Sequence, residues 1–378
     1  MPDLQTDVAI IGGGLAGLVA ARLLQQRGID FVLLEARDRL GGRILSVDKE
    51  GAQTDDGFDL GPSWFWPGMQ PRLAALVRDL NLATFPQHLD GDLVVERRRG
   101  EPLQRYPAFG QDPPSMRIAG GTAALVRALA QSIPVERVYL NTPVTRAVID
   151  HGGPTLVSDQ GAAVRSRGLI LAAPPRVLAE GLSFDPPLDP GTASSWRQTP
   201  TWMAPHAKFF ALYEQPFWRD AGLSGAAQSM LGPMVDIHDA TSASGKAALF
   251  GFLGLDADER RSIGEAALTS ACVAQLGRLF GPPALSPTAT LFKDWSMDPL
   301  TATAADRLAT GHPMPGQHRR IPGGWSRWIS MAGSETSDIA PGFLAGAVQA
   351  ATRACAEREA ALRATPGRAA VLTSEVYP

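Results

Sequence analysis

The chain has 378 residues, enough for two domains with a sizeable core. Hydrophobic residues make up 44% and charged residues 19%, and the formal net charge of −3 predicts neither nucleic-acid nor anionic-membrane binding. Two cysteines, Cys272 and Cys355, are too few for a disulfide framework, which favours a reducing compartment. Because no run of about 18 apolar residues occurs, we expect no membrane span and a cytoplasmic protein.

The N-terminal stretch predicts a strand, a glycine turn and a helix. Residues 7–11 are an apolar run of strand character, and Gly12, Gly14 and Gly17 follow with G-x-G-x-x-G spacing. The first glycine permits the tight turn, the second lets a pyrophosphate approach the backbone, and the third lets the helix lie close to the strand. The helix N-terminus, around Leu15 and Ala16, offers N–H groups and partial positive charge to that pyrophosphate.

A second strand is predicted over residues 31–34 and ends at Glu35. Glu35 lies roughly 20 residues past the glycines, where a carboxylate can accept both hydroxyls of an adenosine ribose. We assign the neighbouring residues Ala36 and Arg37 to the same dinucleotide site. This pattern leaves both NAD and FAD open as the cofactor.

The motif that follows decides between them. Arg39-Leu40-Gly41-Gly42-Arg43 is an R-x-G-G-R sequence directly after the second strand. It resembles the flavin-dependent amine oxidase superfamily, which includes monoamine and polyamine oxidases, protoporphyrinogen oxidase and phytoene desaturases. The resemblance implies that the two glycines let the loop pass close to the flavin end of FAD, while the arginines face its phosphates and ring system. The alternative interpretation is a surface loop with two exposed arginines.

The stretch FDLGPSW at residues 58–64 resembles the D-x-G-x-x-W sequence that lines the flavin cavity in this family. The resemblance implies cofactor contacts from Gly61, Pro62, Ser63 and Trp64. In an extended chain Trp64 and Trp66 would face opposite sides, and the sequence does not say which one borders the cavity.

The middle of the chain continues the resemblance. Residues 71–80 predict a short helix, 90–106 a hairpin and 123–131 another helix. Val144 follows a proline, and in relatives the valine of this pair binds adenine through its backbone; a plain strand valine would look the same. The segment between Trp66 and Arg117 is much shorter than in mammalian amine oxidases, which leaves the substrate size open.

Lys208 opens a predicted strand, residues 208–213, followed by Pro216-Phe217-Trp218. In the family a lysine at this place holds a water against flavin N5. A partly desolvated ammonium heading an aromatic strand would have a lowered pKa and could relay a proton. The alternative is an ordinary solvated lysine at a strand edge.

Residues 234–241 contain Asp236, His238 and Asp239, but their spacing fits no compact metal-ligand pattern. We therefore predict a solvated loop there and no metal site. A helix is predicted over residues 263–279, with Cys272 in its core-facing side.

Two departures from the family concern residues 303–305. Relatives that bind flavin covalently have a cysteine there, whereas this chain has Thr303, Ala304 and Ala305, so we expect non-covalent FAD. The family's aromatic cage for the amine would consist here of Ala305 and Phe343. This cage is incomplete, which leaves the substrate open.

The C-terminal part resembles the last flavin-binding segment of the family. Residues 321–325 resemble the strand leading to the motif at 331–337, whose Gly333, Ser334 and Glu335 would hold the ribityl chain and phosphates. A long helix is predicted to follow, to about residue 362. The resemblance places its N-terminus, with Phe343 and Ala345, at the flavin pyrimidine, where the helix dipole favours negative charge.

Together these features imply an α/β fold with a discontinuous Rossmann-like FAD-binding domain (1–70, 117–185 and 296–378) and a smaller mixed α+β substrate domain (71–116 and 186–295). The expected activity is oxidation of a C–H bond next to an amine nitrogen. Electrons would pass to flavin N5 and then to O2, giving H2O2. The alternatives are oxidation or desaturation of a non-amine substrate, and a flavoprotein with a non-catalytic binding role. The sequence leaves the substrate, the electron acceptor and the oligomeric state open.

Overall fold

The computed structural model describes residues 4–107, 113–150, 152–307, 311–316 and 321–364 and has a mixed α/β architecture, as the sequence predicts. By the density of internal contacts the chain divides into two compact units. Unit 1 comprises Met1–Leu40, Leu129–Thr199 and Met314–Pro378, and unit 2 comprises Gly41–Ala128 and Pro200–Pro313. The FAD-binding and substrate domains, with the boundaries given above, stay a prediction.

Unit 1 contains a five-stranded sheet in which every strand is parallel to its neighbours. The strand order is β10 (Val138–Tyr139), β3 (Phe31–Leu34), β2 (Val8–Ile11), β14 (Leu169–Leu171) and β21 (Ile329–Met331). The central strand β2 reads VAII and is buried along its whole length, as expected for a parallel strand covered on both faces.

A second, mixed sheet of five strands completes the strands of unit 1. Its order is β1 (Leu4–Thr6), β13 (Ala163–Ser166), β12 (Gly153–Ser158), β11 (Val144–Asp150) and β15 (Ser183–Asp185). The helices of this unit are α1 (Leu15–Gln26), α4 (Pro175–Gly181), α5 (Pro190–Gln198) and α9 (Leu344–Ala364). Short 3-10 turns lie at Val135–Arg137, Gly323–Trp325 and Ser334–Thr336.

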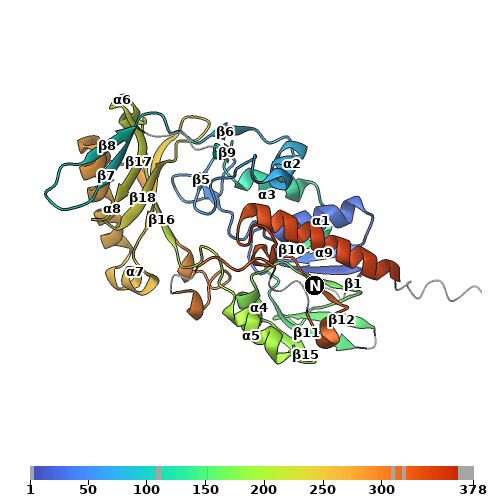
Figure 1. Ribbon diagram of the computed structural model, residues 1–378. Coiled ribbons are helices and arrows are strands. Elements are labelled where there is room, and N and C mark those ends of the chain that lie inside the picture. The colour runs from blue at the N-terminus through green and yellow to red at the C-terminus, as the bar shows by residue number, and fades with distance from the viewer. Residues whose placement is uncertain (1–3, 108–112, 151, 308–310, 317–320, 365–378) are drawn as a thin grey trace, which may run out of the picture. The chain divides into compact units, whose positions relative to one another are not determined.

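Helix α1 ends at a left-handed glycine. Gly28 has φ +66°, and the amides of Gly28 and Ile29 donate to the carbonyls of Gln25 and Leu24 at 3.1 and 3.0 Å. This is the Schellman arrangement that satisfies the last carbonyls of a helix. Figure 1 shows α9, in red, beside α1, in blue, and the Cys355 thiol on α9 lies 3.5 Å from the Ala20 carbonyl on α1.

Unit 2 is built on a seven-stranded sheet. Its order is β20 (Ala289–Asp294), β16 (Ala207–Tyr213), β19 (Ala247–Leu253), β18 (Met234–Asp239), β17 (Leu223–Ser229), β7 (Asp92–Glu96) and β8 (Gln104–Pro107). Two small antiparallel pairs accompany it: β4 (Ser46–Val47) with β5 (Phe58–Asp59), and β6 (Thr84–Pro86) with β9 (Met116–Ile118). The antiparallel β7–β8 pair confirms the hairpin predicted over residues 90–106.

The remaining helices lie in unit 2, apart from the last turn of α3. They are α2 (Pro71–Asp79), α3 (Ala123–Gln131), α6 (Phe217–Asp220), α7 (Ala257–Ile263) and α8 (Glu265–Phe280), with 3-10 turns at Pro282–Leu285, Trp295–Met297 and Ala304–Asp306. Helix α8 packs against the sheet (Figure 1), and its buried Cys272 joins Phe209 and Ala211 of β16 in one core cluster, as predicted for Cys272. Because side chains alternate along a strand, Phe210 and Leu212 enter a second cluster on the opposite face. That opposite face carries Lys208.

Three local predictions are corrected by the structure. Residues 234–241 are not a solvated loop: most of them form β18, paired on both sides, with Met234 and Ile237 in the α8-facing core. Residues 321–325 contain a 3-10 turn rather than a strand, and the strand β21 begins only at Ile329. The helix predicted from residue 263 begins at Glu265, because Gly264, at φ +84°, separates α8 from α7.

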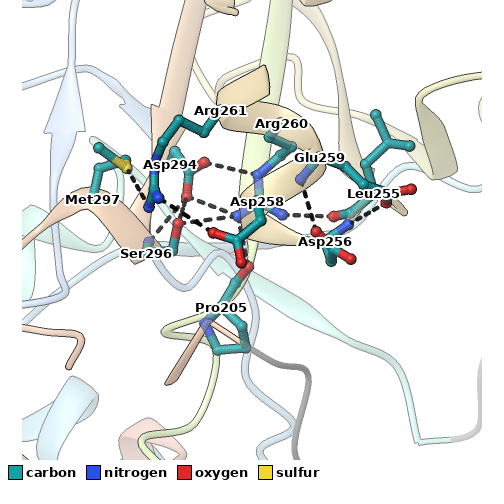
Figure 2. A network of polar contacts seen from close by, with 10 residues as sticks. All are labelled: Pro205, Leu255, Asp256, Asp258, Glu259, Arg260, Arg261, Asp294, Ser296 and Met297. Carbon is teal, nitrogen blue, oxygen red and sulfur yellow. Dashed lines mark hydrogen bonds and ion pairs between the residues drawn. The ribbon is translucent and has the colours of Figure 1, made fainter. Parts of the chain in front are cut away.

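A buried guanidinium joins α7 to the sheet of unit 2 (Figure 2). Arg260 is 3% exposed and makes a bidentate ion pair with Asp294, at 2.7 and 2.8 Å. It also donates to the carbonyls of Leu255 and Pro205 at 2.6 and 2.7 Å. Although burial acts to raise the pKa of Asp294, the hydrogen bonds from Arg260 and Ser296 outweigh it and hold that pKa below its usual value. Arg260 thus fixes the residues just before β16 and at the end of β20.

We expect Arg260→Met to lower the free energy of unfolding by about 3–5 kcal/mol, because the change leaves a largely buried carboxylate without its partner. Arg261, one residue on, is the matched control. Its side chain is 42% exposed and pairs with the exposed Asp258, so Arg261→Met should cost less than about 1 kcal/mol. Urea denaturation of both variants would measure the difference, and equal midpoints would contradict this account of Arg260.

Candidate functional site

The turn between β2 and α1 is shaped by two glycines that pack on each other. Gly12 has φ +102°, which L side chains rarely adopt. A Cβ on Gly17 would lie 1.9 Å from the Gly12 carbonyl oxygen, so the first turn of α1 rests directly on the end of β2. A Cβ on Gly14, by contrast, would meet nothing within 4 Å. The geometry therefore matches the structural roles expected of Gly12 and Gly17 and leaves the chain at Gly14 open to a ligand.

The N-terminus of α1 is uncapped. Gly14 is the N-cap in an extended conformation, and among the described residues no side chain caps it and no acidic residue stands in the first turn. Leu15 and Ala16, which follow, are buried apolar residues. The first N–H groups of a helix have no partner inside the helix and carry the positive end of its dipole. A phosphate-type anion fits such a helix start.

Glu35 follows β3 and turns its carboxylate toward the glycine turn. The side chain is 6% exposed; Oε2 accepts from the Gly13 amide at 2.6 Å and Oε1 from the Arg37 amide at 2.8 Å. Its carbonyl accepts from the Thr142 amide at 2.9 Å, two residues before Val144 begins β11. The carboxylate predicted to bind the ribose therefore lies against the glycine turn.

Four neighbouring parallel strands end level with one another in unit 1. Ile11, Leu34, Leu171 and Met331 stand opposite one another in register at the ends of β2, β3, β14 and β21. Ligands of such sheets bind outside the carboxyl ends of the strands. The structure thus brings the glycine turn and Glu35 to the same edge as Gly333, which follows β21.

The segment after β21 is tightly folded. A Cβ on Gly333 would lie 2.6 Å from the Ala173 carbonyl oxygen, and Ser334 Oγ donates to Glu335 Oε2 at 3.0 Å. The Gly342 amide donates to the Ser334 carbonyl at 3.1 Å, which ties this turn to the start of α9. The other predicted contacts in unit 1 are partly exposed: Ala36, Arg37, Arg39, Val144, Phe343 and Ala345.

The rest of the predicted contacts lie in unit 2, beginning with Gly41, Gly42 and Arg43 of the R-x-G-G-R loop. Gly41 and Gly42 both have positive φ, +103° and +57°, which explains the glycine pair. Arg43 donates to the Trp202 carbonyl at 3.1 Å. A Cβ on Gly61 would lie 1.9 Å from the Arg43 carbonyl oxygen, so the R-x-G-G-R loop crosses the FDLGPSW stretch in direct contact.

Lys208 ends in a cradle made by that same stretch. Lys208 is only 4% exposed. Its Nζ donates to the Asp59 carbonyl at 3.2 Å, to the Gly61 carbonyl at 2.5 Å and to Ser63 Oγ at 3.0 Å. An ammonium has three protons to donate, and these acceptors match them. The prediction that Lys208 is desolvated is confirmed, and the alternative of a solvated strand-edge lysine is wrong.

Aromatic rings enclose the same ammonium. Nζ lies 4.6 Å from the ring centre of Phe250 and 5.1 Å from that of Phe252. Burial lowers the pKa of Lys208 to about 7; the nearby Asp59 opposes this shift and Arg117 adds to it. An amine with a pKa near 7 can both hold and release a proton at neutral pH.

Two buried charges near Lys208 were not assigned from the sequence. Asp59 is 2% exposed, and its Oδ1 accepts from Ser46 Oγ at 2.6 Å and from the Thr122 amide at 2.8 Å. Arg117 is 6% exposed and donates to the Thr241 carbonyl at 2.7 Å. The D-x-G-x-x-W pattern already pointed to Asp59, whereas nothing in the sequence around Arg117 indicates a buried arginine.

The two tryptophans of the FDLGPSW region are both partly exposed. Trp64 packs against Phe250 and, edge-on, against His238, with ring centres 5.5 and 4.8 Å apart, and it donates to Gln87 Oε1 at 2.7 Å. It therefore borders the face of the sheet that carries Lys208, and it directly follows Ser63 of the cradle. Pro62, between Gly61 and Ser63, is partly exposed. Ala305, predicted to occupy one position of the aromatic cage, is exposed in a 3-10 turn.

Known proteins resemble this chain over most of its length. Residues 15–103 and 95–357 match the family described as flavin containing amine oxidoreductase. A Mycobacterium tuberculosis protein provisionally named a flavin-containing monoamine oxidase is 26% identical over 96% of this chain and 98% of its own length. Putrescine oxidase of Kocuria rosea is 25% identical over 86% of this chain and 90% of its own length.

Among solved structures, putrescine oxidase bound to putrescine covers 95% of this chain and 100% of its own with a TM-score of 0.81 at 23% identity. At this level of identity the likeness establishes the fold. It confirms the α/β class predicted from the sequence. Within the described residues, no helix is long and apolar enough to cross a membrane.

The glycine turn allows a direct test of the predicted nucleotide site. Gly17→Ala should destabilise the protein by at least about 1–3 kcal/mol and empty it of flavin, because the new Cβ overlaps the Gly12 carbonyl. Gly14→Ala has room for its Cβ in the protein, so it should destabilise the protein less than Gly17→Ala, with only the cost of alanine at a helix N-cap, while flavin binding weakens. Flavin absorbance per protein and thermal unfolding of the apoproteins would separate the two effects. Full flavin content in both variants would exclude this turn as the cofactor site.

Proposed function

Because the chain belongs to the family of flavin-containing amine oxidoreductases, we propose that it uses non-covalently bound FAD to oxidise the C–H bond next to an amine nitrogen. The observation that carries this proposal is Lys208, a lysine held by Asp59, Gly61 and Ser63 with its pKa near 7. The matching family and the relatives named as amine oxidases support the reaction class.

The residues of unit 1 fit an FAD dinucleotide. The uncapped start of α1, open at Gly14, suits the pyrophosphate, and the buried Glu35 carboxylate beside it suits a ribose. Ser334 and Glu335, at the same edge of the parallel sheet, would hold the ribityl chain. In unit 2, the R-x-G-G-R loop and the Lys208 cradle carry the residues that the family resemblance assigns to the flavin end of the cofactor.

When bound, FAD would accept two electrons from the substrate C–H bond and pass them to O2, giving H2O2 and an imine that water hydrolyses. The chain's own contribution is positional and electrostatic. Lys208 holds a proton at Nζ, and the rings of Phe250 and Phe252 keep bulk water from it. The start of α9 would place its positive dipole end where negative charge develops.

The Lys208 face of the sheet also carries a carboxylate that bears on the substrate. Lys208 stands opposite Phe252, and Phe252 opposite Asp236, so the three residues form one row across β16, β19 and β18. The Asp236 side chain is 45% exposed and lies 2.9 Å from His238 Nε2. A carboxylate there would suit the second ammonium of a diamine, so diamines such as putrescine belong with monoamines among the substrates to test.

The reaction class is tested by mixing the holoenzyme anaerobically with monoamines and diamines. We expect at least one class to bleach the oxidised flavin spectrum and to release aldehyde and ammonia after air is admitted. A normal flavin spectrum that no amine bleaches would transfer the proposal to a non-amine substrate. A protein without flavin would refute the cofactor assignment.

Lys208→Met should slow flavin reduction or its reoxidation by at least about tenfold, because no proton can be held at Nζ. Lys293→Met is the matched control: Lys293 stands directly opposite Lys208 on β20, but its Nζ lies over the Trp295 ring at 4.6 Å. Stopped-flow absorbance of the two half-reactions would measure both variants. Wild-type rates in Lys208→Met would end the case for this lysine.

The attachment of the cofactor has its own test. With Thr303, Ala304 and Ala305 where covalent relatives have cysteine, acid precipitation of the holoenzyme should leave the yellow colour in the supernatant. Colour that stays with the precipitated polypeptide would show a covalent bond.

A further inference from the structure

The buried carboxylate of Asp59 has one oxygen that is fully satisfied and one that is not. Oδ1 accepts from Ser46 Oγ, the Thr122 amide and Thr122 Oγ1, at 2.6, 2.8 and 2.9 Å. Oδ2 is buried and has no hydrogen-bond partner among the described residues. A buried acceptor without a partner is costly and requires an explanation.

The donors on Oδ1 account for half of the group. Thr122 precedes α3, and the Ala123 amide donates to Ser46 Oγ at 3.0 Å, so Asp59 and Ser46 together cap the start of this helix. A helix N-terminus stabilises a carboxylate in its charged form. This structural role explains why residue 59 is an acid, but it does not explain why Oδ2 is buried without a hydrogen bond.

The nearby Lys208 explains the burial of Oδ2. Its Nζ binds the main-chain carbonyl of Asp59, not the carboxylate, so the charges of the two residues lie near one another in a core from which water is excluded. In such a core opposite charges interact strongly, and each favours the ionised form of the other. The Oδ2 atom can therefore stay without a hydrogen bond and still stabilise a cation.

We propose that Asp59 is the buried counter-charge of Lys208 and that its ionisation decides whether the Lys208 amine carries a proton. Asp59 is then a positioning residue, because it acts through Lys208. Asp59 raises the pKa of Lys208 against the effect of burial, and the nearby Arg117 lowers it. The pKa of Asp59 is itself raised: burial is the largest cause, and Arg117, Ser46 and Thr122 act against it.

Other charges around Lys208 are engaged elsewhere. Lys293 on β20 lies over the Trp295 ring and 3.6 Å from Asp298. On β18, His238 lies 2.9 Å from Asp236. On β9, Arg117 donates to backbone carbonyls and adds positive charge to the same core. Asp59 is accordingly the anion assigned to balance Lys208.

The charge of Lys208 can be read without any substrate. The lysines of the chain are Lys49, Lys208, Lys246 and Lys293. With 13C at the lysine Cε positions of the holoenzyme, each amine gives a pH titration by NMR, and the Lys208 signal is the one lost in Lys208→Arg.

Asp59→Asn keeps an acceptor at Oδ1 and removes the charge. We expect the titration midpoint of Lys208 to fall by about one pH unit or more. Thr122→Val and Ser46→Ala each remove one donor to Oδ1, so both should lower the midpoint by less. If Asp59→Asn does not fold, Thr122→Val carries the test. A Lys208 midpoint that stays at the wild-type value in the folded variant overturns the proposal.

Asp56→Asn is the matched control, because Asp56 pairs with Lys246 at 3.0 Å on the same unit. It removes a carboxylate of the same unit that pairs with another lysine, and it should leave the Lys208 midpoint unchanged. Only the catalytic consequence of this inference rests on the proposed function. That consequence is that the pH profile of flavin reoxidation, measured after photoreduction, moves with the Lys208 midpoint. The NMR titration stands even if no amine is oxidised, so the two can fail separately.

Discussion

The organisation of unit 2 depends on the burial of one ammonium. Removing a lysine amine from water is unfavourable unless its protons find acceptors, and here the acceptors come from the short stretch between Asp59 and Ser63. Meeting that requirement fixes the stretch against β16. Trp295 strengthens the arrangement by donating to the Leu60 carbonyl at 3.0 Å. The R-x-G-G-R loop is then fixed as well, since Gly61 lets the Arg43 backbone approach within contact.

The two buried carboxylates of the candidate site, those of Glu35 and Asp59, are suited to different roles because their surroundings differ. Glu35 receives backbone amides on both of its oxygens, at the edge of the parallel sheet where a ligand hydroxyl could replace them. Asp59 receives its donors on one oxygen and is enclosed by protein. The first carboxylate is therefore suited to binding and the second to setting a neighbouring charge.

Sequence reasoning succeeded where the constraint is local in the chain. The glycine turn, the buried stripe of α1 and its end at Gly28 follow from backbone sterics and short-range periodicity, and the structure agrees. It also placed Lys208 on a buried strand.

Sequence reasoning failed at β18. There Asp236, His238 and Asp239 suggested a solvated loop, but the partners that satisfy a polar residue are set by the fold. Asp239, for example, accepts from Trp218 and Arg219. Arg117 was missed for the same reason, since its acceptors lie more than a hundred residues away.

The burial of the two thiols has a consequence for the lifetime of the protein in use. The reaction proposed above makes H2O2, to which the protein itself would be exposed, and cysteine oxidation begins at the thiolate. Burial raises the pKa of Cys272 and of Cys355 to about 12, so neither thiol ionises in working conditions. Met69 and Met230 are instead 69% and 80% exposed. Oxidation of the protein by H2O2 would therefore begin with methionine sulfoxide formation on the surface, a modification that reductases reverse, and the buried thiols would be spared.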